Sequence, residues 1–263
     1  MAIKPRVFVT VRNTKRPQRA KSPYIDGCFE AMGVMGSVYI NSQIPSSSGL
    51  GSSAAVTVAT LSAINDEFSL HKTREEIANM AFEIEKNVQK GRASPTDTTV
   101  SSYGGIVLIA GGSRRRLAPQ NLNLVIGDSL VSHSTAKMVE QVGDLKKKHP
   151  EIVDPILDAI EGVSMSAIHH LNNPKELGRY MDMNHALLDA LGVGHPQLSK
   201  LVLASRAAGA FGAKITGAGG GGCMVALCAK HLKIRVAGAI EACEARAIIT
   251  GIDTEGARKE KNV

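Results

Sequence analysis

The sequence predicts an α+β fold divided into two domains, and three observations support this prediction. The chain has 263 residues, 43% of them hydrophobic, so it is long enough to bury a large core. Segments with the alternation of strands and segments with the spacing of helices are mixed in both halves. Residues 111–119 (GGSRRRLAP) form a polar, turn-rich stretch, which favours domains at 1–117 and 118–263.

The chain begins with strand patterns and a loop that leads into a helix. Residues 7–12 (VFVTVR) alternate as a half-buried strand does, and residues 37–44 predict a second strand. Proline, serine and glycine in residues 45–51 indicate a loop. Residues 52–65 (SSAAVTVATLSAIN) are rich in small side chains, which predicts a tightly packed helix.

A second helix is predicted over residues 73–89, where apolar residues recur at helical spacing. Thr73 and Glu76 have the spacing of a capping box, in which each side chain bonds a backbone N–H of the other residue. A short helix over 97–103 and a strand over 105–110 complete this half.

The second half is mostly helical by pattern. A strand is expected over residues 122–126 (LNLVI), and four helices follow over 136–147, 153–171, 175–191 and 197–207. Residues 214–227 (KITGAGGGGCMVAL) read as a glycine run followed by a strand. A last helix is expected over 231–244 and a last strand over 247–250.

The net charge of +7 comes from one segment of the chain. Residues 1–25 hold seven basic side chains and no acidic one, so the remainder carries as many acidic as basic groups. Aromatic residues make up only 3% of the chain, and tryptophan is absent, which disfavours a stacking platform for bases. We therefore expect no nucleic-acid partner.

The four cysteines, at 28, 223, 228 and 243, lack C-x-x-C spacing and predict free thiols in a reducing cytosol. No apolar run reaches the roughly 18 residues needed to cross a bilayer. The first residues do not contain the apolar stretch of a secretory signal. We expect a cytoplasmic protein with no membrane partner.

The sequence PSSSGLGSSAA at residues 45–55 is a candidate anion-binding loop. Glycines let the backbone approach an anion closely, and the N–H groups of a first helical turn point at it. The alternative is a flexible turn before a helix. The loop lacks the lysine of a Walker A motif and the spacing of a dinucleotide-binding fingerprint.

A second candidate is the glycine run at residues 217–222, in which five of six residues are glycine. Such density is incompatible with a regular helix or strand and suits a main chain that lies against a ligand. The alternative is a tight bend at the edge of a sheet.

A third candidate is the carboxylate pair Glu85 and Asp97. On the predicted helix, Glu85 lies at the border of the buried face and Glu83 on the solvated side, so only Glu85 is expected to reach an interior site. Asp97 follows the rigid turn Ser94-Pro95-Thr96. The alternative for either acid is a surface charge or a helix cap.

Together these features resemble the mevalonate kinases of archaeal type, in the superfamily of galactokinase, homoserine kinase, mevalonate kinase and phosphomevalonate kinase. Residues 45–55 resemble the phosphate loop of that superfamily, and residues 214–223 (KITGAGGGGC) resemble its third motif. Residues 184–193 (NHALLDALGV) and 94–97 (SPTD) also resemble mevalonate kinase segments. The resemblance covers residues 37–249 and implies the two-domain fold of these small-molecule kinases.

The resemblance also implies a reaction and roles for residues. The reaction is phosphorylation of mevalonate at its C5 hydroxyl by ATP, with Mg²⁺, in a homodimer. Asp97 would be the base, and Ser53 and Glu85 would hold magnesium. The ATP phosphates would contact Pro45, Ser46, Ser47, Ser48, Gly49, Leu50, Gly51, Ser52, Ser53, Ala54 and Ala55. Mevalonate would be bordered by Thr135, Gly217, Ala218, Gly219 and Gly220.

The sequence departs from the family pattern in three places. Glu85 and Asp97 are twelve positions apart where the family has about eleven, and Val56 stands where some members have tyrosine. The first family motif, which carries a lysine near the transferred group, is absent, so we expect the chain to enter at the second or third family strand. Losing such a cation costs on the order of 10²–10³ in rate.

Two other functions are consistent with the same residues. One is a kinase for a related small alcohol such as phosphomevalonate or homoserine. The other is an inactive nucleotide-binding remnant with a basic N-terminal arm.

Overall fold

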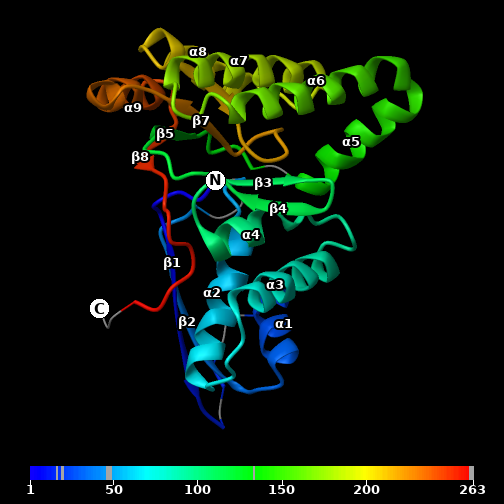
Figure 1. Ribbon diagram of the computed structural model, residues 1–263, viewed down its shortest axis with the longest axis vertical. Coiled ribbons are helices and arrows are strands. Elements are labelled where there is room, and N and C mark those ends of the chain that lie inside the picture. The colour runs from blue at the N-terminus through cyan, green and yellow to red at the C-terminus, as the bar shows by residue number, and fades with distance from the viewer. Residues whose placement is uncertain (16, 19–20, 46–48, 133, 261–263) are drawn as a thin grey trace. The chain divides into compact units, whose positions relative to one another are not determined.

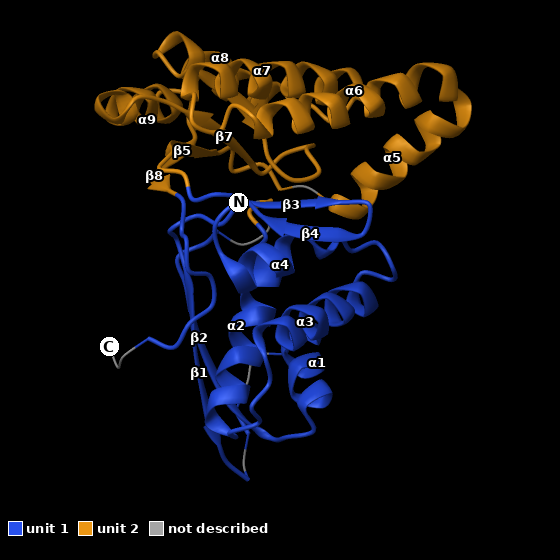
Figure 2. Cartoon of the chain, in the orientation of Figure 1, with its two compact units in different colours: residues 1–46, 51–119, 252–263 blue, residues 47–50, 120–251 orange. Residues whose placement is uncertain are grey.

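The computed structural model describes residues 1–15, 17–18, 21–45, 49–132 and 134–260, and Figure 1 shows its elements. The chain divides into two compact units (Figure 2). Unit 1 comprises residues 1–46, 51–119 and 252–263, and unit 2 comprises 47–50 and 120–251. Strands and helices occur in both units, which confirms the predicted α+β fold. The domain limits at 117 and 118 stay a prediction, since the segment after residue 251 packs within unit 1.

The described residues of unit 1 form four helices, a long antiparallel strand pair and a short hairpin over residues 107–116. The strands of the long pair are β1 (Val7–Asn13) and β2 (Gly36–Ser42). The helices are α1 (Pro23–Met32), α2 (Ser52–Glu67), α3 (Arg74–Val88) and α4 (Pro95–Tyr103). Their apolar faces share one core, which includes Val11, Phe29, Val38, Val58, Leu61, Ile64, Ile77 and Ile84.

The capping box predicted at the start of α3 is confirmed. The Thr73 hydroxyl accepts a hydrogen bond from the Glu76 backbone N–H, and the Glu76 carboxylate accepts one from the Thr73 N–H. These two bonds satisfy N–H groups that the helix itself leaves free, and they fix where α3 begins.

The sequence patterns predicted no element over residues 23–32, where the structure has helix α1. Pro23 supplies a favoured first helical residue, and Gly33 ends the helix with a φ of 64°. Its buried residues Ile25, Phe29 and Met32 lie at i, i+4 and i+7 and pack into the core of unit 1.

Residues 111–119, expected from the sequence to be a polar, turn-rich domain junction, include a strand. They contain β4 (Ser113–Arg116), which pairs with β3 (Val107–Ala110) in an antiparallel hairpin. Gly111 and Gly112 form the turn with φ of 54° and 76°. Every residue of β4 is polar and exposed, so its sequence does not show the alternation of apolar and polar residues that predicts a strand. It is a strand because it pairs with β3.

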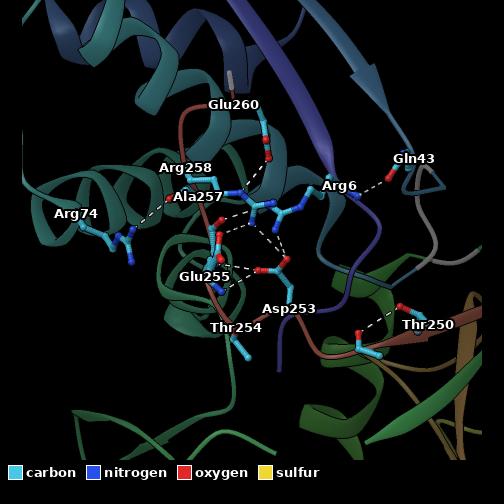
Figure 3. A network of polar contacts seen from close by, with 12 residues as sticks. Arg6, Gln43, Arg74, Thr250, Asp253, Thr254, Glu255, Ala257, Arg258 and Glu260 are labelled. Atoms are coloured by element: carbon cyan, nitrogen blue, oxygen red, sulfur yellow. Dashed lines mark hydrogen bonds and ion pairs between the residues drawn. The ribbon is translucent and has the colours of Figure 1, made fainter. Parts of the chain in front are cut away.

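The last described segment, residues 252–260, is held in unit 1 by backbone and charged contacts. The N–H of Gly105 donates to the carbonyl of Asp253 at 2.6 Å, and the N–H of Ala257 donates to Ser101 at 2.9 Å. The Asp253 carboxylate pairs with Arg6 and lies 3.7 Å from the Arg258 guanidinium (Figure 3).

Unit 2 is built on an antiparallel sheet with the order β6-β7-β5-β8. The strands are β5 (Asn123–Asp128), β6 (Gly212–Ile215), β7 (Cys223–Leu227) and β8 (Arg246–Gly251). The helices are α5 (Thr135–Lys148), α6 (Pro150–Ile168), α7 (Pro174–Ala190), α8 (Pro196–Ala207) and α9 (Lys233–Glu241). The core lies between the sheet, α8 and α9 and includes Val125, Leu198, Leu201, Val202, Ile215, Met224, Val236 and Ile240.

The predicted elements of unit 2 are confirmed with small shifts at their ends. The predicted helix over 231–244 is a 3₁₀ turn (Lys230–Leu232) that leads into the shorter α9. The glycine run has a strand on both sides, because β6 precedes it and β7 follows it. Among the described residues, no helix combines the length and the apolar character needed to cross a membrane.

Candidate active site

The start of α2 in unit 1 has the features of an anion-binding helix end. Gly51 precedes the helix with a φ of 67°, a conformation that glycine adopts without strain. No side chain of the described residues caps this end, so the N–H groups of the first turn keep their hydrogen-bonding capacity. The partial positive charge of the helix end also favours an anion there.

Ser53 and Glu85 meet beside this helix end. The Ser53 hydroxyl, in the first turn of α2, donates a hydrogen bond of 2.8 Å to Glu85 Oε1. Glu85 lies in the last turn of α3 and is only 4% exposed, whereas Glu83 is exposed beside Lys86. The prediction that Glu85 and not Glu83 reaches the interior is confirmed.

The environment of Glu85 favours its protonated form. Burial raises the pKa of this carboxyl above its ordinary value, and the hydrogen bond from Ser53 lowers it. The negative charge of Asp97 raises the pKa of Glu85 further.

Asp97 stands in the first turn of α4. The Ser94 hydroxyl accepts a hydrogen bond from the Thr96 N–H, and Pro95 occupies the first helical position, so this end of α4 is firmly defined. Asp97 is exposed, and partial desolvation by the neighbouring protein atoms raises the pKa of its carboxyl, while the charge of the Met1 amino group lowers it.

Gly51 makes room for the Asp97 carboxyl. A Cβ atom at residue 51 would lie 3.1 Å from the carboxyl carbon of Asp97 and 3.2 Å from its Oδ2. The absence of a side chain therefore lets this carboxylate lie against the start of α2. Unit 1 thus gathers Gly51, Ser53, Glu85 and Asp97 from three helices, as the sequence analysis expected of the last three.

These donors suit a magnesium ion. Mg²⁺ prefers hard oxygen ligands and binds through one or two carboxylates, with water and phosphate completing its shell. Ser53 and Glu85 supply a hydroxyl and a buried carboxylate within 2.8 Å of each other. The raised pKa values of Glu85 and Asp97 are those of carboxylates that a cation would stabilise in their charged form. Among the described residues, no group of three or more His, Cys, Asp or Glu side chains could hold a metal ion.

The glycine run in unit 2 is a loop that only glycine can form. Gly217 and Gly219–Gly222 all have positive φ, between 62° and 147°. A Cβ at residue 219 would collide with the carbonyl oxygen of Val193, and one at residue 220 would collide with Met138. The N–H of Gly220 donates to that same Val193 carbonyl at 2.8 Å.

Gly217 lies against the part of the phosphate loop that belongs to unit 2. A Cβ at residue 217 would lie 3.2 Å from the Gly49 carbonyl oxygen and 3.3 Å from its Cα. The two backbones are therefore close together without a side chain between them, so Gly217 packs against Gly49.

The remaining predicted site residues are distributed as follows. Thr135 is the exposed first residue of α5 in unit 2. Pro45 and residues 52–55 belong to unit 1 and residues 49–50 to unit 2, while Ser46, Ser47 and Ser48 lie outside the described residues.

Two residues that contact the glycine run, Val193 and Met138, were not predicted from the sequence. Val193 ends the segment NHALLDALGV, whose resemblance to kinase helices could have indicated it, and Met138 lies one turn after Thr135. Their contact with the run depends on long-range packing, which spacing along the chain does not report. Between Glu85 and Asp97 the chain turns at Lys90 and Gly91, which have φ of 53° and 82°.

The chain is similar in sequence to known proteins. Residues 23–105 match the model of the GHMP kinases N terminal domain, and residues 164–244 match the model of the GHMP kinases C terminal region. A mevalonate kinase of Thermococcus sibiricus is 45% identical over 230 residues, covering 85% of this chain and 68% of the relative. A mevalonate kinase of Pyrococcus abyssi is 43% identical, covering 86% of this chain and 69% of that protein.

Solved structures show the same similarity. The crystal structure of L. major mevalonate kinase in complex with R-mevalonate superposes with a TM-score of 0.83 at 25% identity, covering 96% of this chain and 87% of that one. The Methanococcus jannaschii mevalonate kinase gives a TM-score of 0.79 at 24% identity, covering 96% and 90%.

Proposed function

We propose, from the premise that this chain belongs to the mevalonate kinase family of the GHMP kinases, that it phosphorylates mevalonate with ATP. The products are 5-phosphomevalonate and ADP. The observation that carries the proposal is the cluster of Ser53, Glu85 and Asp97 at the open start of α2, in a chain 45% identical to a mevalonate kinase. Phosphoryl transfer requires positioning and neutralisation of charge more than covalent chemistry, and this cluster would supply both by holding Mg²⁺ beside the start of α2.

The phosphates of ATP would bind along residues 45–55. The first-turn N–H groups of α2 and its partial positive charge attract them, and Gly49 and Gly51 let the backbone approach closely. No side chain of the described loop is basic, so this binding is carried by backbone dipoles.

Ser53 and Glu85 would hold Mg²⁺, through the Ser53 hydroxyl and the Glu85 carboxylate. When bound, the ion neutralises the phosphate charge that builds up during transfer. Glu85 must be ionised to serve as a ligand, and its raised pKa means that it binds the ion more weakly as the pH falls.

Asp97 would be the general base. Its carboxylate accepts the proton of the C5 hydroxyl as the oxygen of that group attacks the γ-phosphorus, and ADP leaves with the electrons of the broken bond. A raised pKa makes Asp97 a better proton acceptor than an ordinary aspartate.

In unit 2, Gly217 would support the phosphate loop through Gly49, and residues 217–220 would border mevalonate together with Thr135. We further propose that the protein is a cytoplasmic homodimer with no membrane partner. We propose no nucleic-acid partner, because the excess basic charge is confined to residues 1–25.

The decisive experiment follows ADP release by the purified chain with ATP, Mg²⁺ and a panel of mevalonate, phosphomevalonate and homoserine. Mevalonate is expected to have the highest kcat/KM by at least about 100-fold, and the Asp97→Asn variant is the inactive control. A preference for another alcohol would reassign the substrate. ATP binding without turnover on any of the three would identify a nucleotide-binding protein that is not a kinase.

A further inference from the structure

Strand β6 lies at one edge of the unit 2 sheet as the described residues form it. Its inner side pairs with β7, in a register that places Ala213 opposite Ala226. An edge strand presents N–H and carbonyl groups on its outer side, and proteins cover such groups rather than leave them open. The groups that cover β6 come from side chains instead of from another strand.

The peptide groups of Ala213 are held by two charged side chains. Asp182, on α7, accepts a hydrogen bond of 2.9 Å from the Ala213 N–H. Arg206, on α8, donates a bond of 2.8 Å from Nη2 to the Ala213 carbonyl oxygen. The Arg206 Nε lies 2.8 Å from the same Asp182 oxygen. We call Asp182, Arg206 and the Ala213 backbone the edge clamp.

Helix α7 reaches the strand because glycines face each other at the contact. A Cβ added to Gly178 would collide with the backbone of Phe211, and one added to Gly212 would collide with the backbone of Gly178. This approach holds α7 directly against β6, which puts Asp182 within hydrogen-bond distance of the strand. The clamp is therefore a built contact between three elements.

The clamped strand leads directly into the glycine run. Ile215 ends β6, the Thr216 N–H bonds the Cys223 carbonyl at 3.0 Å, and Gly217 then touches Gly49 of the phosphate loop. Glycines at positive φ contribute little rigidity of their own, so the place of this loop depends on the strands at its two ends and on the bonds of Gly220 and Gly222 to the Val193 and Val131 carbonyls. Strand β7 is fixed by neighbours on both sides, whereas β6 has a neighbour on one side and the clamp on the other.

We propose that Asp182 and Arg206 are positioning residues for nucleotide binding, which hold β6 so that Gly217 supports the phosphate loop at Gly49. This proposal rests on the proposed kinase function for its kinetic consequence. Neither side chain is assigned a contact with ATP or mevalonate, so their effect passes through the backbone. Arginine suits the role because its planar guanidinium group can contact a carbonyl and a carboxylate at the same time.

The test compares Asp182→Ala and Arg206→Ala with a matched control on the same helix. Arg179→Ala removes an exposed arginine whose pair with Glu176 at 2.8 Å touches no strand. Asp182→Asn keeps an oxygen that accepts the Ala213 N–H, and Arg206→Lys keeps the charge without the fork. The conservative variants keep the test informative if an alanine variant does not fold.

The first measurement is steady-state kinetics with ATP and mevalonate. We expect the KM for ATP to rise about tenfold in both alanine variants, because small displacements of a binding loop are costly, with kcat within about twofold. Asp182→Asn is expected within about threefold of the wild type, and Arg179→Ala is expected to be unchanged. A KM for ATP that stays at the control value in both alanine variants overturns the proposal.

The second measurement is hydrogen exchange, which does not depend on turnover. The amides of Gly220 and Gly222 bond the carbonyls of Val193 and Val131, and their exchange is expected to quicken about tenfold in the alanine variants. Faster exchange over all of unit 2, with a fall in kcat and in melting temperature, would show a merely structural role and overturn the proposal. If the wild type does not phosphorylate mevalonate, the kinase function fails, and exchange at these glycines alone decides whether the clamp exists.

Discussion

The carboxylate cluster of unit 1 and the glycine run of unit 2 are two candidate functional regions of opposite kinds. The first presents side chains, Ser53, Glu85 and Asp97, from the ends of three helices. The second presents backbone, because residues 217 and 219–222 have no side chain and adopt positive φ. The carboxylate cluster depends on the charge of its side chains. The glycine run depends on the absence of side chains, which lets backbone segments come close together.

The difference determines how each region fails when it is altered. A change of charge in unit 1 should leave the fold intact and alter the chemistry, since each carboxylate could become an amide of the same shape. A side chain added in unit 2 should strain the fold itself, because its Cβ meets backbone atoms. The following predictions, from the largest effect to the smallest, test this contrast.

Asp97→Asn is expected to lower kcat about 10³-fold, because general base catalysis typically contributes about 10²–10⁴-fold. The KM for mevalonate and the melting temperature should change little. The measurement is steady-state ADP release beside a thermal melt. A kcat within tenfold of the wild type would remove Asp97 from the role of base.

Gly219→Ala is expected to destabilise the protein by about 3 kcal/mol, the sum of an unfavourable φ of 78° and the collision with the Val193 carbonyl. Gly112→Ala is the matched control, since Gly112 has a φ of 76° with nothing within 4 Å of the added atom. It should cost only about 1 kcal/mol.

The two glycine variants are compared by chemical denaturation. If both cost the same, the glycine run tolerates a side chain, and the contrast between the two regions is wrong on the unit 2 side.

Glu85→Gln is expected to raise the Mg²⁺ concentration needed for half-maximal activity by at least about tenfold, which is about 1.4 kcal/mol of binding. Glutamine retains an oxygen that accepts the hydrogen bond from Ser53, so the local packing is preserved. Glu83→Gln, on the exposed side of α3, is the control and should have no effect. Equal Mg²⁺ requirements for the two variants would exclude Glu85 as a ligand.

The smallest effect is a pH dependence of stability in the absence of Mg²⁺. The pKa of Glu85 is raised in the folded protein, so the folded state holds this proton more tightly than the unfolded state, and stability is lost as the pH rises through the raised pKa. Glu85→Gln does not ionise and should melt a few degrees higher than the wild type at pH 8. The difference should vanish near pH 4, where the carboxyl is protonated in both states.

Thermal melts in a chelating buffer at the two pH values measure this effect. Addition of Mg²⁺ at pH 8 should then raise the melting temperature of the wild type more than that of Glu85→Gln. A wild type that is the more stable of the two at pH 8 without the ion would contradict the expected cost of the buried carboxylate.

Local patterns predicted most elements because their causes are local. The start of α3 follows from Thr73 and Glu76, which bond each other across three residues. The burial of Glu85 and the exposure of Glu83 follow from an angle around the same helix. The signal for α1 was also present, in Pro23 followed by apolar residues at helical spacing.

The sequence by itself determined the α+β class, most helices and strands, and the residue types that phosphoryl transfer requires, because hydrophobic period, caps and glycine density act over a few residues. Only the tertiary structure decided that β4 is a strand, that Val193 and Met138 enclose the glycine run, and that Asp182 and Arg206 meet at Ala213. Each of these depends on groups distant in the chain. Such contacts form only when the whole core is buried, and no local pattern encodes their partners.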